Sequence, residues 1–177
     1  METSRRRSMI DGGRQAGNAL IVYVSVSHGN TARIARAMGE ALNAERLEPE
    51  LVDPASLGGY DVVGFGSGIF AGTPHPRLRG FIEHLPPVAG TPAFTFTTSG
   101  FGRSQSRPWE ASLEDVLRSK GYVVVGSFAC RGFDTWLPLR LVGGVNKGHP
   151  DAADLARAHA FARHVADEVL SLRGCIL

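Results

Sequence analysis

Residues 19–31 read ALIVYVSVSHGNT, an almost continuously apolar run that passes directly into a short polar loop. The apolar part, 19–26, is typical of a β-strand that is buried on both faces of a sheet. Residues 30–44 follow with four apolar side chains at helical spacing, namely Ile34, Ala35, Met38 and Leu42. A buried strand, a polar loop and a helix in this order indicate an α/β fold, in which helices begin at the carboxyl edge of a parallel sheet.

The rest of the chain continues the alternation of β-rich and helical segments. Further strands are predicted at 47–53, 61–66, 93–98 and 122–129, with a short turn-like segment at 54–59. Helices are predicted at 76–85, from a cap at Ser106 with Pro108 in the first turn, and at 151–172, with a loop at 130–149 between the last strand and the last helix. We therefore expect a three-layer α/β/α sandwich around a five-stranded parallel sheet.

Composition and charge narrow the class of protein. The 177 residues suit one domain, predicted at 19–177 after a disordered tail at 1–18. That tail holds four arginines and two acidic residues, and the rest of the chain has 15 basic and 15 acidic residues. The chain after the tail therefore has no net charge, which argues against a nucleic-acid partner. No segment has the roughly 20 apolar residues of a membrane span, and Cys130 and Cys175 form no CxxC pair or metal-ligand cluster. We expect a cytoplasmic protein with no metal.

The loop after the first strand, residues 25–31, has the chemistry of an anion site. We call it the first loop. Backbone N–H groups at a helix N-terminus bind anions, Gly29 permits close approach, and the hydroxyls of Ser25, Ser27 and Thr31 add neutral donors. Neither G-x-G-x-x-G nor G-K-[ST] occurs here, which excludes the dinucleotide fingerprint and the P-loop. The alternative is that these polar residues only cap the helix.

The first loop resembles the phosphate loop of flavodoxins, roughly [ST]-x-[ST]-[GT]-G-x-T, with His28 where Thr is usual. The resemblance continues along residues 19–172. Residues 66–72 (GSGIFAG) follow the third strand and residues 98–102 (TSGFG) follow the fourth, as the two flavin-flanking loops of flavodoxins do. Residues 143–150 (GGVNKGHP) look like a segment of one branch of the family. The resemblance implies a flavodoxin-like fold with strand order 2-1-3-4-5 and FMN at the switch point, a topology for which flavodoxin is itself the standard example.

The resemblance also implies roles for individual residues. The phosphate of FMN would be held by the first loop, through Ser25, Ser27, His28, Gly29, Asn30 and Thr31. The isoalloxazine ring would be bordered by two further sets, first Ser67, Gly68, Ile69, Phe70, Ala71 and Gly72, and second Thr98, Ser99, Gly100, Phe101 and Gly102. Phe70 and Phe101 are the candidates for stacking on the ring.

Three functions remain open from the sequence. The first is an electron carrier that shuttles electrons between a reductase and an acceptor protein; the second is an FMN-dependent NAD(P)H or quinone oxidoreductase of the same fold. The third is a binding module without redox chemistry. Only His28 and His75 lie in or beside the three loops as acid–base groups, which favours the carrier. The neutral body lacks the strong acidic field typical of carrier flavodoxins, which favours the enzyme.

Overall fold

The structure, a computed structural model, describes residues 17–70, 72–100, 103–133 and 144–174. Residues 1–16 of the predicted tail lie outside this part of the chain. A parallel sheet forms the middle layer, in the order β2-β1-β3-β5-β6. Its strands are β1 (Ala19–Val24), β2 (Glu45–Leu47), β3 (Val62–Phe70), β5 (Pro92–Ser99) and β6 (Val123–Arg131). Because β5 and β6 are the fourth and fifth parallel strands along the chain, the predicted order 2-1-3-4-5 is confirmed.

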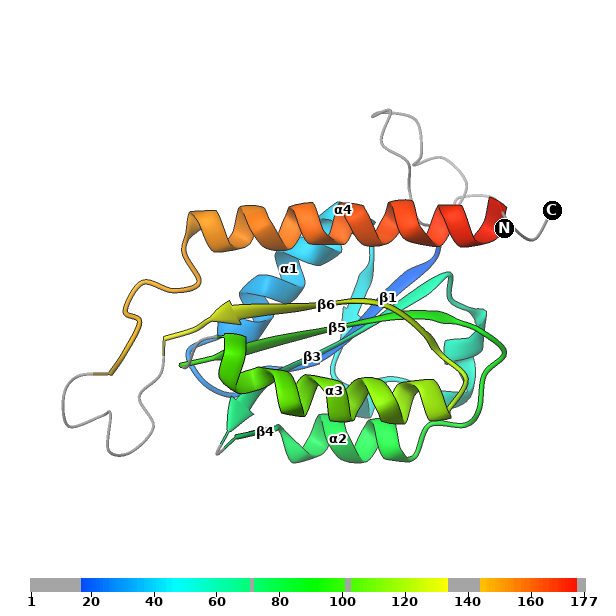
Figure 1. Cartoon of the computed structure of the whole chain (residues 1–177), viewed down its shortest axis with the longest axis horizontal. Helices are drawn as coiled ribbons and strands as arrows, with labels where there is room; N and C mark the ends of the chain where they lie inside the picture. The colour runs from blue at the N-terminus through cyan, green and yellow to red at the C-terminus, as the bar shows by residue number, and fades with distance from the viewer. Residues whose placement is uncertain (1–16, 71, 101–102, 134–143, 175–177) are drawn as a thin grey trace, which may run out of the picture.

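Helices cover both faces of the sheet (Figure 1). On one face lie α1 (Asn30–Leu42) and α4 (Ala152–Gly174), and on the other lie α2 (Pro76–Glu83) and α3 (Arg103–Ser119). The expected three-layer sandwich is therefore confirmed. None of the helices in the described part of the chain is both long enough and apolar enough to cross a membrane.

Two hydrophobic cores result, one on each face of the sheet, because side chains alternate along a strand. In β1, Ile21 packs into the core under α1 and α4, whereas Leu20 and Val22 pack into the core over α2 and α3. All three are at most 1% exposed. Burial on both faces explains the apolar run of β1, which ends at Val24, two residues before the predicted end, and Val26 beyond it is 52% exposed.

Two glycines of β3 make room for aromatic rings of the neighbouring strand. A Cβ atom on Gly66 would lie 1.9 Å from Cζ of Phe96, and one on Gly64 would lie 2.4 Å from Cζ of Phe94. Both rings are essentially buried. The glycines are therefore needed for the packing of the core under α1 and α4.

The strand predicted at 47–53 is wrong. The strand that pairs with β1 is Glu45–Leu47, and the 3-10 helix Pro49–Leu51 follows it. Pro49 has no N–H to donate to a strand ladder, and its fixed φ suits the start of a helical turn. The turn-like segment predicted at 54–59 is a second 3-10 helix, Pro54–Gly59.

Two other boundaries differ from the prediction by more than two residues. The third strand continues four residues beyond Gly66 to Phe70, because its last residues pair with β5 and with the short antiparallel strand β4 (Thr73–Pro74). The helix expected to start from a cap at Ser106 already begins at Arg103, so Ser106 lies inside α3 and is not its cap. Propensity at one residue does not place a helix end when neighbouring residues can extend it.

The two ends of the described domain meet at Asp61. This carboxylate accepts a hydrogen bond from the backbone N–H of Asn18 at 2.8 Å, just before β1, and forms an ion pair with Arg173 near the end of α4. The backbone N–H of Asp61 in turn donates to the carbonyl of Asn18 at 2.8 Å. These contacts lie at the amino ends of β1 and β3.

Candidate functional site

The carboxyl ends of three neighbouring strands lie in register. Val24, the last residue of β1, pairs with Ser67 of β3, and Ser67 and Gly68 pair with Thr97 and Thr98 of β5. The first loop and the residues at the ends of β3 and β5 therefore meet at one edge of the sheet. This is the edge at which open α/β sheets bind their ligands.

The first loop turns sharply into α1. His28 and Gly29 have left-handed backbone with φ of 52° and 67°, and Gly29 is the N-cap residue without a side-chain capping bond. The hydroxyl of Ser25 accepts a hydrogen bond from the N–H of Ala32 at 3.2 Å. Ser25 thus satisfies one of the four N–H groups that a helix leaves without an intrahelical partner. The capping alternative accounts for Ser25 but not for the other polar residues of the loop.

Thr31 and Asn30 are the buried residues of this loop, at 3% and 8% exposure. The Thr31 hydroxyl lies 2.8 Å from the hydroxyl of Thr98, so that the start of α1 is joined to the end of β5. The Asn30 side-chain amide donates to the carbonyl of Phe133 at 2.8 Å. Ser27, His28 and Gly29 are more accessible and form the outer part of the loop.

Near the carboxyl end of β3, Ser67 is fully buried. Its hydroxyl donates to the carbonyl of Gly68 at 2.7 Å and accepts from the N–H of His75 at 2.8 Å. The Ser67 side chain therefore fixes the β3–α2 connection. Ile69 and Phe70 pair through their backbone with β4, and Gly72 has a φ of 82°.

Of the predicted site residues 98–102, the structure describes Thr98 and Ser99 at the end of β5 and Gly100 directly after it. The carbonyl of Ser99 accepts from the N–H of Gly132 at 2.9 Å, and the carbonyl of Gly100 accepts from the side chain of Asn146 at 2.7 Å. The predicted site residues Ala71, Phe101 and Gly102 lie outside the described residues. The structure thus brings together parts of all three predicted loops.

Two contributors that sequence reasoning did not assign to the site are Gly132 and Phe133, just after β6. The ring of Phe133 lies 4.4 Å from the ring of His28, measured between centroids. Besides the bond from Asn30 to its carbonyl, Phe133 donates its N–H to the carbonyl of His149 at 3.0 Å. The signal in the sequence was a glycine followed by an aromatic residue directly after the last strand.

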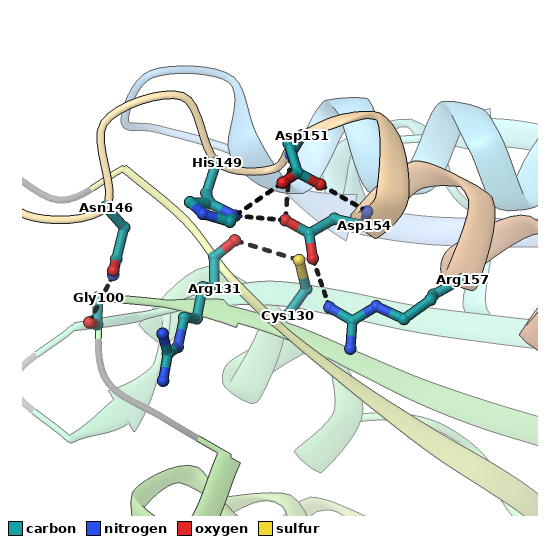
Figure 2. Close-up of polar contacts among 8 residues, drawn as sticks. All are labelled: Gly100, Cys130, Arg131, Asn146, His149, Asp151, Asp154 and Arg157. Carbon is teal, nitrogen blue, oxygen red and sulfur yellow. Dashed lines mark hydrogen bonds and ion pairs between the residues drawn. The ribbon is translucent and has the colours of Figure 1, made fainter.

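A cluster of polar side chains lies at the start of α4 (Figure 2). Asp151 and Asp154 cap the helix reciprocally, because the side chain of each accepts the N–H of the other at 2.8 and 3.0 Å. Nδ1 of His149 lies 2.6 Å from Asp154, and Arg157 forms an ion pair with the same carboxylate. Burial opposes ionisation of Asp154, but the hydrogen bonds from His149, the Asp151 N–H and Arg157 outweigh it and lower its pKa to about 2.

The ligand atoms of His149, Asp151 and Asp154 lie within 4.8 Å of one another, as metal ligands would. Both oxygens of Asp154 already accept hydrogen bonds from protein groups. The arrangement is therefore accounted for by capping of the helix.

Cys130 lies beside this group at the end of β6. The side chain is 6% exposed, and its thiol donates to the carbonyl of Arg131 at 3.1 Å. Burial, followed by the negative charge of Asp154, raises the pKa of Cys130 to about 12. A thiol held in this state is a poor nucleophile.

Comparisons with known proteins agree with this geometry. A family model described as a flavodoxin domain matches residues 20–130. An uncharacterized protein of Methanocaldococcus jannaschii is 37% identical over 147 residues, which are 83% of this chain and 97% of that protein.

Solved structures share the fold at lower identity. Oxidised flavodoxin 2 from Bacillus cereus has a TM-score of 0.67 at 21% identity, over 85% of this chain and 99% of that one. The flavodiiron protein from Giardia intestinalis has a TM-score of 0.60 at 16% identity, over 87% of this chain and 36% of that one. On the family match and the relative's 37% identity, together with the site geometry, the chain belongs to the flavodoxin domain family.

Proposed function

We propose that the chain binds FMN at the carboxyl edge of the sheet and carries electrons between protein partners, a reductase and an acceptor, in the cytoplasm. The observation that carries the proposal is the first loop, where left-handed His28 and Gly29 lead directly into the start of α1 at the carboxyl edge of the sheet. Such a turn leaves backbone donors and the positive end of the helix dipole available to an anion.

The residues present fit the phosphate of FMN. The hydroxyl of Ser27 and the backbone N–H groups of the first helical turn would bind the phosphate oxygens, and the Ser25 hydroxyl can donate while it accepts from Ala32. No Lys or Arg occurs among residues 25–31, so these donors are neutral. The backbone of residues 67–70 and 98–100 would border the ring. When bound, FMN supplies the redox chemistry, and the protein supplies placement and exclusion of water.

Binding of FMN is tested with Thr31→Ala, which removes the hydroxyl that joins the first turn of α1, and with it the first loop, to Thr98 at the end of β5. Fluorescence quenching should give a weaker FMN dissociation constant in the variant, while far-UV circular dichroism shows an intact fold. Thr91→Ala is the matched control, because Thr91 is similarly buried but precedes β5 at the opposite edge of the sheet. Unchanged FMN affinity in Thr31→Ala, or no FMN binding by the natural chain, would contradict the proposal.

The enzyme alternative is favoured by one observation, the balance of 15 basic and 15 acidic residues after the tail. Such a surface lacks the field that steers an acidic carrier to a basic partner. Anaerobic mixing of the FMN-loaded protein with NADH or NADPH separates the two functions. Rapid bleaching of the flavin absorbance indicates a reductase, and its absence together with reduction by a protein donor indicates a carrier.

A further inference from the structure

Phe133 contacts the first loop in two independent ways. Its carbonyl accepts the side-chain amide of Asn30 at 2.8 Å. Its ring lies 4.4 Å from the ring of His28, with the two planes tilted by 47°. These contacts connect residues about 100 positions apart in the chain, and they flank Gly29 on both sides.

Gly132 allows this approach because it has no side chain. A Cβ atom at this position would lie 2.7 Å from Nδ2 and 3.0 Å from Cγ of Asn30. The backbone of Gly132 is not in the left-handed region, so an alanine would fit its conformation but would force the Asn30 amide to shift away from its bond to Phe133. The N–H of Gly132 also donates to the carbonyl of Ser99, which holds the segment against the end of β5.

The first loop needs such support. His28 has a φ of 52°, a conformation that costs a residue with a Cβ free energy. Strained backbone of this kind persists where the surroundings over-determine it. The side chains on both sides of Gly29 are held by Phe133, and the segment itself is held by Ser99 and by the carbonyl of His149.

We propose that Gly132 and Phe133 are positioning residues that clasp the first loop in its anion-binding conformation and thereby set the affinity for the phosphate of FMN. In this arrangement Asn30 serves the site through its contact with Phe133, and the phosphate is bound by backbone N–H groups and hydroxyls. The inference rests on the proposed function, and it assigns to the end of β6 a part in a site otherwise built from β1, β3 and β5.

The experiment compares Gly132→Ala and Phe133→Leu with the natural chain for binding of FMN and of riboflavin, which lacks the phosphate. We expect Gly132→Ala to weaken FMN binding about tenfold, with a change of less than about twofold for riboflavin, since only FMN uses the first loop. In the apo-protein, amide hydrogen exchange of Gly29, Asn30 and Thr31 should become faster, a readout that needs no flavin.

Gly80→Ala is the matched control, because a Cβ on Gly80 meets nothing within 4 Å and the residue lies in α2. A second test places Gly132→Ala in an Asn30→Ala background, where the nearest remaining atom, the Cβ of residue 30, lies 3.2 Å away, so the effect of the added alanine at 132 should be smaller. Two outcomes would contradict the positioning role of Gly132 and Phe133. One is equal weakening of FMN binding and riboflavin binding in Gly132→Ala, and the other is unchanged FMN binding with unchanged amide hydrogen exchange in that variant. A natural chain that binds no FMN would instead overturn the proposed function.

Discussion

The hydroxyl groups of Thr31 and Thr98 share a buried hydrogen bond of 2.8 Å, although the two residues lie 67 positions apart. Thr31 belongs to the first turn of α1, and Thr98 lies near the end of β5. Their bond sets the spacing between two of the three segments that border the candidate site. Neither hydroxyl is open to water, since the residues are only 3% and 4% exposed.

Replacement of either threonine by valine should therefore be costly. Thr31→Val or Thr98→Val alone leaves one hydroxyl buried without this partner, and we expect a loss of about 1–3 kcal/mol in the free energy of unfolding. The double variant removes both polar groups and should lose less than the sum of the single losses. Urea unfolding of all four proteins measures the coupling. Additive losses would mean that the two hydroxyls do not depend on each other.

The lowered pKa of Asp154 predicts that the folded chain loses stability at low pH. This pKa is lowered from 3.8 to about 2 in the folded chain, so the folded state binds the proton less readily than the unfolded state. The resulting stabilisation, on the order of 2 kcal/mol, is complete above about pH 4 and is lost as the pH falls from there toward 2.

The measurement is the free energy of unfolding at pH 6 and at pH 3 for the natural chain and for Asp154→Asn. The variant should be less stable at pH 6, and the gap between the two proteins should narrow at pH 3. Asp167→Asn on the exposed side of α4 is the control, because Asp167 is solvent-exposed. A gap that stays constant over this pH range would contradict the role given to Asp154.

Cys130 should resist thiol reagents while the protein is folded. Its pKa of about 12 leaves almost no thiolate at pH 8, and its side chain is only 6% exposed. In a Cys175→Ser background, which leaves Cys130 as the one thiol, Ellman's reagent should react slowly with the folded protein and rapidly in urea. Fast reaction without urea would show that this thiol is accessible and ionised.

Gly66→Ala should damage the core under α1 and α4. The added Cβ would lie 1.9 Å from the ring of Phe96, which is 1% exposed and packed in this core. We expect a loss of about 1–3 kcal/mol or more in thermal or urea unfolding. Phe96→Leu should recover part of this loss in the double variant. Gly80→Ala, with open space at its Cβ, should cost nothing and serves as the control.

The sequence predicts the layers of this fold well, because the spacing of apolar residues along a strand or helix follows from which of its faces are buried. The continuous apolar run of β1 and the helical stripe of α4, including Ala158, Ala162 and Val165, are direct consequences of packing, and these residues are buried in the structure. Short edge elements carry a weaker signal. The strand at Glu45–Leu47 is polar and only three residues long, so nothing in its sequence distinguishes it from the residues that follow.

The sequence predicted only those parts of the candidate site that lie at or just after the ends of strands. The convergence of the segments after β1, β3 and β5 follows from their parallel register, but the part played by Gly132 and Phe133 does not. The Asn30 amide donates to the carbonyl of Phe133, and the Ser67 hydroxyl donates to the carbonyl of the next residue. Both bonds depend on side-chain geometry, which the spacing of residues in the sequence does not predict. The family pattern names the positions, and the structure shows that the hydroxyls of Thr31, Thr98 and Ser67 bond to other groups of the protein.

The meeting of Asn18 and Arg173 at Asp61 has a practical consequence for engineering. The start of β1 and the end of α4 lie within reach of one carboxylate, so a short linker can join them and new termini can be opened in a surface loop elsewhere. The old junction lies at the amino ends of the strands, away from the proposed flavin edge. A reporter domain inserted there would leave the opposite end of the sheet clear for an incoming redox partner.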